Sequence, residues 1–232
     1  MDKYTLTEKT KIIDGVTLYK IEAIKDFGNV EKGDFGGYIE SEKNLSQRGN
    51  AWVYADAKVY ADAKVYGNAW VYGDACVYDD AKVYGDACVC GGARVYGNAK
   101  VYGDACVCGD AKVYGNAWVY GNACVYGDAK VYGDACVCGG ARVYGNAWVY
   151  GNARVYGDAK VYDDAQVYGD AKVYGDAKVY DDAWVYDDAK VYGGEVYSYA
   201  CVCGGEVCGD DAEVSEIITL NGKRYKLIKE NK

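Results

Sequence analysis

Small apolar residues recur at every sixth position through most of this chain. Alanine keeps this spacing from Ala51 to Ala189 and valine from Val53 to Val191, which gives 24 unbroken hexads over residues 51–194. Each Ala-x-Val segment alternates inward and outward positions, as a short strand with one buried face does. A Tyr follows in most hexads, and then Gly with Asp or Asn, which are residues that tolerate the positive φ of a corner. One hexad is therefore predicted to form one strand and one corner.

A single hexad cannot bury its Ala and Val, so the strands must stack to form a core, with coils about 4.8 Å apart. This predicts an all-β solenoid, but the repeat leaves the coil size open. A coil of three hexads is triangular in section, and a coil of two hexads is flatter. The near-copies 69–98 and 117–146 are offset by a whole number of two-hexad coils but not of three-hexad coils. The outward residues favour three hexads, because they then form one apolar-to-basic column of Trp52, Trp70, Cys88, Cys106, Cys124, Arg142, Lys160 and Lys178.

Both ends of the chain differ from the array. Residues 11–24 and 216–229 each predict a hairpin, because Asp14-Gly15 and Asn221-Gly222 separate apolar runs. Such hairpins would cover the open edges of a solenoid. Ile39 precedes the array in the alanine frame, as does Leu45, so an irregular first coil is expected from about residue 39. After the array the valine spacing slips, and we interpret this as unwinding into the cap; the residues concerned are Val191, Val196, Val202, Val207 and Val214.

These patterns divide the chain into three expected segments. Residues 1–50 form a hairpin cap and the first coil, residues 51–194 form the β-helix, and residues 195–232 form an irregular coil and a second cap.

The repeat V-Y-G-D-A-K resembles the hexapeptide repeat of left-handed parallel β-helices. The segment from Ala23 to Tyr54, AIKDFGNVEKGDFGGYIESEKNLSQRGNAWVY, is similar to the segment that precedes the array in YdcK-like hexapeptide-repeat proteins of bacteria and phages. This resemblance implies a left-handed, triangular helix with 18-residue coils, and no established activity. The chain departs from hexapeptide acyltransferases after the aliphatic residue, where it has Tyr or Cys in place of a small or acidic residue.

The composition argues against catalysis. The chain has no His, the most common general base near neutral pH, and its four Ser all lie outside the array. We therefore expect no enzyme activity, no catalytic residue and no cofactor. The formal net charge of −9 argues against nucleic-acid binding, and no apolar run is long enough for a signal peptide or a membrane helix. A cytoplasmic protein with reduced cysteines is the expectation.

The Cys-Val-Cys motif is the sharpest chemical feature of the sequence. With three hexads per coil, Cys88 lies beside Cys106 and Cys90 beside Cys108. Residues two apart in a strand are roughly 7 Å apart, so the four thiols are expected to form a flat rectangle that suits tetrahedral zinc poorly. A disulfide between adjacent coils is geometrically feasible. The alternative is that Cys replaces Tyr or Lys without a function.

The predicted surface provides the remaining candidates. Exposed Trp favours interfaces, and acidic corners add charge to the surface. The candidate interaction residues are Trp52, Trp70, Trp118, Trp148, Trp184, Asp163, Asp181 and Asp187. The sequence thus predicts a non-catalytic scaffold that binds another protein or itself. The alternatives are a phage-type inhibitor that mimics nucleic acid and, less favoured because His is absent, an acyltransferase-like enzyme.

Overall fold

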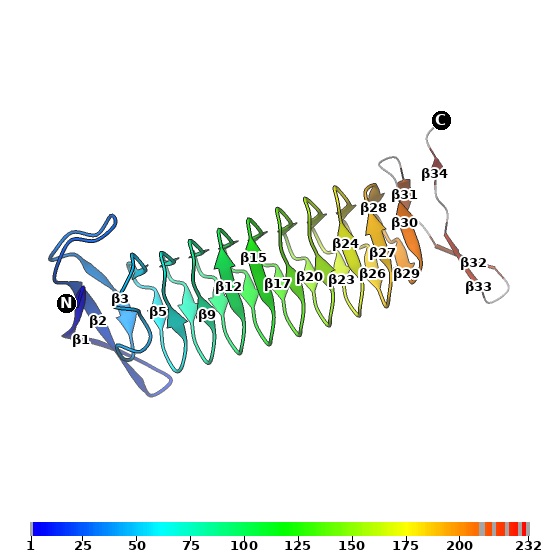
Figure 1. Cartoon of the computed structure of the whole chain (residues 1–232). Helices are drawn as coiled ribbons and strands as arrows, with labels where there is room; N and C mark the ends of the chain where they lie inside the picture. The colour runs from blue at the N-terminus through cyan, green and yellow to red at the C-terminus, as the bar shows by residue number, and fades with distance from the viewer. Residues whose placement is uncertain (1, 209–211, 215–216, 221–222, 227–228, 231–232) are drawn as a thin grey trace. The chain divides into compact units, whose positions relative to one another are not determined.

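The computed structural model describes residues 2–208 and, for the backbone alone, residues 212–214, 217–220, 223–226 and 229–230. The chain divides into two compact units, residues 1–116 and 117–232. The described part of both units is built from strands and corners, without a helix (Figure 1). No helix among these residues is therefore long and apolar enough to cross a bilayer.

Each coil of the first unit contributes one strand to each of three faces. Within each face, the strands of the array run parallel to one another. The first face consists of β3 (Phe35–Ile39), β5 (Lys58–Val59), β8 (Cys76–Val77), β11 (Arg94–Val95) and β14 (Lys112–Val113). The second consists of β4 (Trp52–Val53), β7 (Trp70–Val71), β10 (Cys88–Val89) and β13 (Cys106–Val107). The third consists of β6 (Lys64–Val65), β9 (Lys82–Val83) and β12 (Lys100–Gly103).

The strand register settles the coil size. Val53 pairs with Val71, and Val89 pairs with Val107, so equivalent residues on adjacent coils are separated by three hexads. The prediction of a β-solenoid with three hexads per turn is confirmed, and the two-hexad alternative is wrong. The left-handed winding that the family resemblance implies stays a prediction.

The interior of the coil is filled by small side chains. Every Ala and Val of the repeat is fully buried or nearly so. Backbone amides of one coil donate to carbonyls of the next, as in the bonds from Trp70 N to Ala87 O at 2.9 Å and from Tyr72 N to Val89 O at 3.0 Å. Inward-facing groups are thus used for packing and outward-facing ones remain available, which places all candidate chemistry on the surface.

The corners require a left-handed backbone at the fifth position of the hexad. Gly67 has φ of +72°, and a Cβ there would lie 2.9 Å from the backbone nitrogen of Gly85 in the next coil. Ala55 occupies the equivalent position at φ of +54°, a conformation that costs an L-residue free energy. The preference for Gly therefore has both a conformational and a steric cause.

The N-terminal hairpin is confirmed. β1 (Tyr4–Ile13) pairs antiparallel with β2 (Val16–Ala23), and the turn residues Asp14 and Gly15 both have positive φ, as a two-residue hairpin turn requires. β1 begins earlier than the pattern predicts. β2 then pairs antiparallel with β3, so the hairpin continues the first face of the solenoid (Figure 1).

The first coil starts near residue 39 as expected, but its register differs from the sequence frame. Ile39 pairs with Val59, and Leu45 forms a parallel bridge with Val65, so the partners in each pair lie further apart in sequence than three hexads. Ile39 and Leu45 therefore take the place of the valine of the hexad in the structure, although a count in steps of six residues aligns them with its alanine. The first coil is thus longer than those of the array.

The second unit repeats the three faces. One face consists of β17 (Lys130–Val131), β20 (Trp148–Val149), β23 (Gln166–Val167), β26 (Trp184–Tyr186) and β29 (Cys201–Cys203). Another consists of β16 (Cys124–Val125), β19 (Arg142–Val143), β22 (Lys160–Val161), β25 (Lys178–Val179), β28 (Glu195–Val196) and β31 (Ala212–Val214). The third consists of β15 (Trp118–Gly121), β18 (Cys136–Val137), β21 (Arg154–Val155), β24 (Lys172–Tyr174), β27 (Lys190–Tyr192) and β30 (Glu206–Cys208).

The prediction that the array unwinds after residue 194 is wrong. Val196 pairs in parallel with Val179, and Val207 pairs with Val191, so the coils continue with shorter corners. The cause is glycine: Gly194 and Gly205 both have positive φ and their carbonyls accept the bonds that alanine carbonyls accept elsewhere. A glycine at the alanine position lets the chain reach the next strand in fewer residues.

The C-terminal hairpin is present, but it does not join the three faces. β32 (Ile217–Leu220) pairs antiparallel with β33 (Lys223–Lys226) as a separate two-stranded sheet. The predicted turn at 221–222 lies outside the described residues. The strand that pairs with the final coil is β34 (Lys229–Glu230), which runs antiparallel to β31. The edge of that face is therefore covered by β34 and not by the hairpin.

Candidate functional site

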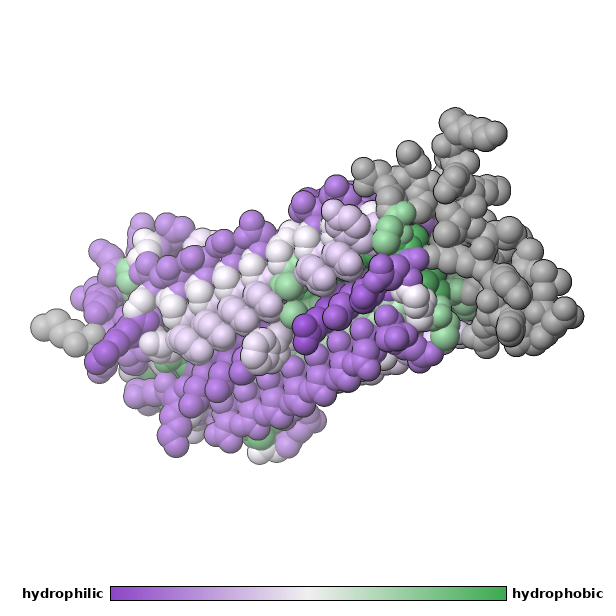
Figure 2. Space-filling view, turned by 45° about the vertical axis from the view of Figure 1, so that its right-hand side comes forward, coloured by the Kyte–Doolittle hydropathy of each residue, from purple (hydrophilic) through white to green (hydrophobic). Residues whose placement is uncertain are grey.

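The second position of the hexad points outward, and it varies most along the chain. Figure 2 shows one side of the surface, where hydrophilic side chains predominate and are interrupted by pale rows and a few small hydrophobic patches. In the first unit, Trp52 pairs with Trp70, Trp70 with Cys88, and Cys88 with Cys106. In the second, Cys124, Arg142, Lys160 and Lys178 follow one another on adjacent coils. The predicted column is confirmed within each unit.

Trp52 is not part of the exposed surface. Its side chain is 1% exposed, because the rings of Tyr4 and Phe27 cover it at centroid distances of 6.0 and 5.2 Å. The prediction of an interaction role for Trp52 is therefore wrong. Its outward position is covered by the N-terminal cap, which the hexad pattern does not reveal.

The other four tryptophans are partly exposed. Trp148 and Trp184 lie on one face of the second unit, one coil on either side of Gln166. Their side chains are 37% and 43% exposed. Trp70 lies on the second face of the first unit, and Trp118 lies on another face of the second unit in register with Cys136. Of these four, only Trp148 and Trp184 share a face within one unit.

Contacts hold Trp148 in place on its face. The ammonium of Lys130, on the preceding coil, lies 4.2 Å from the centroid of the indole, and the ring of Tyr132 meets it edge-on at 6.4 Å. The hydroxyl of Tyr150 donates to Oε1 of Gln166 at 3.3 Å. This face therefore presents ordered aromatic side chains and an amide.

Tyrosines form stacked ladders along the corners. In the first unit, Tyr60, Tyr78, Tyr96 and Tyr114 stack with centroid distances of 5.2, 4.9 and 4.8 Å and nearly parallel planes. Each ring packs on the rings of neighbouring coils, so the ladder links one coil to the next. Burial is the largest cause that raises the pKa of Tyr78 to about 12.

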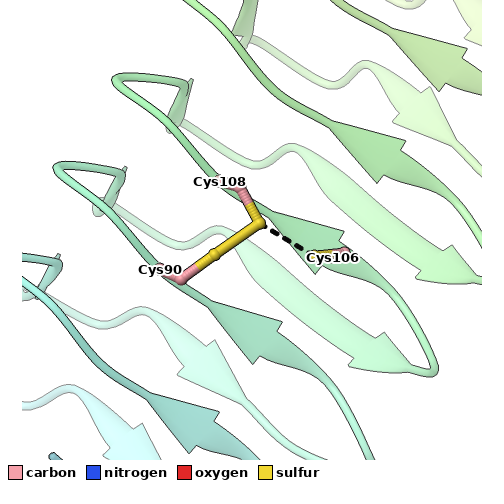
Figure 3. Close-up of a disulfide and its surroundings, with 3 residues drawn as sticks. All are labelled: Cys90, Cys106 and Cys108. Atoms are coloured by element: carbon pink, nitrogen blue, oxygen red, sulfur yellow. Dashed lines mark hydrogen bonds between the residues drawn. A yellow bond between two sulfur atoms is a disulfide. The ribbon is translucent and has the colours of Figure 1, made fainter.

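The four cysteines of β10 and β13 and their corners form a compact cluster, called here the four-sulfur cluster (Cys88, Cys90, Cys106 and Cys108). Cys90 and Cys108 are joined by a disulfide with a Cα–Cα distance of 4.6 Å, as Figure 3 shows. Sγ of Cys106 lies 2.9 Å from Sγ of Cys108. The sulfurs of Cys88, Cys90 and Cys106 all lie within 4.8 Å of one another.

The flat rectangle predicted from strand spacing is wrong for these sulfurs. β10 ends at Val89 and β13 at Val107, so Cys90 and Cys108 already belong to the corner. The bend turns their side chains toward the outward cysteines of the strands, and Figure 3 shows Cys106 directed at Cys108. The expectation that all four are thiols is also corrected for Cys90 and Cys108, whose Cα atoms are brought into disulfide range by in-register stacking.

Hydrogen bonds lower the pKa of the Cys88 thiol. A bond from Cys106 is the largest cause that lowers its pKa to about 6; burial opposes it, and a further bond from the hydroxyl of Tyr72 favours the thiolate. The same bond is the main cause that raises the pKa of Tyr72 to about 12. These hydrogen bonds favour the thiolate form of Cys88, which is the form that binds metals and attacks electrophiles.

The motif at Cys136 and Cys138 gives an internal comparison. Cys136 is in register with Trp118 on one side and Arg154 on the other, so no second Cys-Val-Cys segment adjoins it. A bond from Cys136 is the largest cause that lowers the pKa of Cys138 to about 6. The bond to Cys138 thus comes from within one motif, whereas the bond to Cys88 comes from the motif on the adjacent coil. Among the residues described, only the first unit brings two motifs together.

The acidic candidates lie at corners and are exposed. Asp163, Asp181 and Asp187 all have φ near +56° at the fifth position of their hexads. A carboxylate oxygen of Asp181 accepts the amide of Ser198 at 3.1 Å, and Asp187 accepts the thiol of Cys203 at 3.0 Å. Asp163 and Asp181 belong to one corner and Asp187 to another, so they do not form one site. Their contacts indicate a role in corner structure.

A shallow depression of about 480 Å³ lies on the third face of the second unit. A basic row borders an acidic corner there, and Lys190 is paired with Glu206 at 2.6 Å. The lining residues are Arg154, Lys172 and Lys190 on the strands and Asp134, Asn152, Asp170 and Asp188 at the corner. Sequence reasoning missed this feature, although an Asp/Asn column that repeats every third hexad beside a Lys/Arg column could have indicated it.

Comparisons with known proteins agree with this architecture. Residues 93–109, 141–157 and 147–163 match the family described as YdcK Beta solenoid repeat. The chain is 42% identical over 62 residues to a curated relative, the uncharacterized acetyltransferase YdcK of Escherichia coli (strain K12). That match covers 23% of this chain and 19% of the relative, so the chain spans about a fifth of that protein's length. The chain is therefore a β-solenoid protein with YdcK-like repeats.

Proposed function

We propose that this chain is a non-catalytic scaffold that self-associates through the face formed by β17, β20, β23, β26 and β29, called here the Trp148/Trp184 face. The observation that supports this most is the exposure of two indoles on one regular β-surface, at 37% and 43%. Exposed Trp is energetically costly and is enriched at the centres of protein interfaces. The occupant that fits this face is a second copy of the same chain.

The charge on the three faces of the second unit favours this choice. The outward column of the Trp148/Trp184 face runs Lys130, Trp148, Gln166, Trp184 and Cys201, with one cation and no carboxylate. The other two faces carry rows of three cations each, Arg142, Lys160 and Lys178 on one and Arg154, Lys172 and Lys190 on the other. In each row the last lysine pairs with a carboxylate of the next coil, Glu195 or Glu206, so both rows keep a net positive charge. Like charges would oppose contact between two copies of those faces.

The column is also nearly symmetric about Gln166. If two copies pack face to face in opposite directions, a two-fold axis at the level of Gln166 places Trp148 of each copy against Trp184 of the other. Gln166 then faces its own equivalent and can satisfy its amide groups there. Such an isologous contact is the most common arrangement in homodimers, and aromatic pairs contribute roughly 0.5–1.5 kcal/mol each beyond burial.

Sedimentation velocity over a range of protein concentrations tests the proposal. The unaltered chain is expected to form a dimer, and the double variant Trp148→Ala/Trp184→Ala is expected to remain a monomer. The matched control is Trp70→Ala/Trp118→Ala, which removes two partly exposed indoles from other faces and should leave the dimer intact. Circular dichroism confirms that each variant keeps its β-structure.

Two results would overturn the proposal. One is a monomer at every concentration of the unaltered chain. The other is equal loss of the dimer in both double variants, which would show that the contact does not depend on this face.

Acyl transfer is the second candidate, because the relative's printed name is an acetyltransferase. The sequence supplies no His as a general base, which limits this reading. Calorimetry with acetyl-CoA distinguishes the two: specific saturable binding would favour acyl transfer, and no heat of binding would favour the scaffold.

A further inference from the structure

The four-sulfur cluster has features that the scaffold proposal does not use. Its sulfurs come from two adjacent coils of one unit and point outward from a rigid backbone. Cys90 is 8% exposed, while Cys88 and Cys106 are half-buried, so the cluster lies just below the surface with access from solvent. An accessible group of soft ligands on regular strands is a suitable basis for a binding site.

We propose that, when the Cys90–Cys108 disulfide is reduced, the four-sulfur cluster binds one Zn²⁺ ion as a tetrathiolate site. Zinc takes four ligands in a tetrahedron with Zn–S distances of about 2.3 Å, which puts the sulfurs about 3.8 Å from one another. The observed separations are close to this value, with 2.9 Å between Cys106 and Cys108 and no more than 4.8 Å among Cys88, Cys90 and Cys106.

Small side-chain rotations therefore suffice to form the site. Cys90 and Cys108 lie at corners, where the chain bends, while Cys88 and Cys106 lie on strands, so the two pairs approach the centre from different directions. The four sulfurs can therefore lie out of a single plane, as a tetrahedral site requires.

A hydrogen-bond donor lies beside the cluster, because the hydroxyl of Tyr72 donates to the sulfur of Cys88. Tyr72 lies on the preceding coil, directly beside Cys90, and is placed to donate to the bound sulfur. Donors of this kind orient and tune metal ligands.

Oxidation state controls the site. Reduction of the disulfide by a phosphine or a dithiol transfers two electrons and takes up two protons, which yields the two thiols and the oxidised reductant. Zinc then displaces the proton of each thiol that is still protonated. The disulfide form leaves only Cys88 and Cys106 as thiols of the cluster, which cannot complete a four-sulfur site.

The Cys-Val-Cys segment at 136–138 provides a matched control within the same chain. It has the same sequence, but its neighbours in register are Trp118 and Arg154. A four-sulfur site needs two adjacent motifs, so this single motif is expected not to contribute to the site.

Titration of the full chain with Co²⁺ as a spectroscopic probe, followed by Zn²⁺, tests the proposal. The protein is reduced with a phosphine and kept without oxygen. We expect one Co²⁺ per chain with thiolate charge-transfer and tetrahedral absorption bands, and displacement by one equivalent of Zn²⁺. Zinc K-edge X-ray absorption should show four sulfurs at about 2.3 Å. Cys88→Ser/Cys106→Ser should abolish the bands, and Cys136→Ser/Cys138→Ser should leave them unchanged.

Other outcomes contradict the site. These are no cobalt bands in the reduced chain, equal loss of the bands in both double variants, or a zinc shell dominated by nitrogen or oxygen. If Cys88→Ser/Cys106→Ser fails to fold, the sulfur count of the unaltered chain still decides the question. The chain with its disulfide intact should bind no Co²⁺ at this cluster, and binding there would also overturn the proposal.

Discussion

At the scale of single residues, the fifth position of the hexad decides whether the chain can turn. Most corners use Gly with φ near +70°, and a few use Ala or Asp with φ near +55°. Left-handed backbone costs an L-residue about 1–2 kcal/mol, so the non-glycine corners lower the stability of the coil in which they occur. The exchange of Gly and Ala between equivalent corners measures this effect directly.

We predict that Gly67→Ala lowers the free energy of unfolding by about 2 kcal/mol. The alanine must keep the left-handed backbone of the corner, and its Cβ crowds the backbone of Gly85. Ala55→Gly relieves the same strain and should leave stability unchanged or raise it by up to about 1 kcal/mol. Urea unfolding followed by circular dichroism compares the two. Equal destabilisation by both changes would contradict this account of the corners.

Burial separates two tryptophans that are equivalent in sequence. Trp52 lies under the N-terminal cap and Trp70 is 38% exposed on the next coil. We expect Trp52→Ala to cost roughly 3–5 kcal/mol and Trp70→Ala clearly less, because only the former leaves a cavity. Thermal unfolding of both variants tests this, and similar melting temperatures would show that the cap does not cover Trp52.

At the scale of elements, the tyrosine ladders link one coil to the next. Tyr78 stacks between Tyr60 and Tyr96, so Tyr78→Ala removes two ring pairs. We predict a loss of about 1–3 kcal/mol in unfolding free energy, from roughly 0.5–1.5 kcal/mol per pair. Tyr199, at 81% exposed, is the control, and Tyr199→Ala should have almost no effect. Urea midpoints that fall equally for both variants would exclude a stabilising ladder.

Some of these elements could be predicted from the sequence, and others could not. The hexad predicted the strands, and Asp14-Gly15 predicted the turn of the first hairpin, because both depend on local residues. The cover over Trp52 was missed because Tyr4 and Phe27 reach it from the cap. The coils after residue 194 were missed because Gly194 replaces an interior Ala, which hides the repeat from a count of alanines.

The candidate site was predictable in part. The three-hexad alternative brought Cys88 beside Cys106 and Cys90 beside Cys108 from spacing alone, and the structure confirms these pairs. The convergence of the sulfurs was not predictable, because strand spacing describes Cα atoms and ignores the bend that begins after Val89. To predict the depression beside Arg154, the register of the Lys/Arg column and that of the Asp/Asn column would both have been needed.

At the scale of the whole molecule, the many tyrosines link stability to alkaline pH. Burial is the main cause that raises the pKa of Tyr78 and of Tyr162 to about 12, against an ordinary value of 10.0. A neutral group whose folded pKa is raised stabilises the fold fully below the unfolded pKa, and this contribution is lost as pH rises through the folded pKa. Lys3, whose pKa is lowered to about 8 chiefly by burial, acts in the opposite direction, but its contribution rises between about pH 8 and the ordinary value of 10.5 and is then complete.

We therefore predict that stability falls as pH rises from about 10 to about 12, because the tyrosines lose their contribution in this range while that of Lys3 hardly changes. Urea midpoints across this range, together with tyrosinate absorbance, provide the measurement. Ordinary tyrosine titration near pH 10 with an unchanged midpoint would contradict the prediction.

The central claim for the molecule is self-association through the Trp148/Trp184 face about a two-fold axis at Gln166. The most direct measurement is Gln166→Cys followed by mild oxidation and mass spectrometry of the linked peptides. The account predicts a disulfide between the two substituted positions of two copies, and the same link should be absent when Trp148→Ala/Trp184→Ala is added. No link at this position in a chain whose other cysteines do cross-link, or a link that persists without the two indoles, would contradict it.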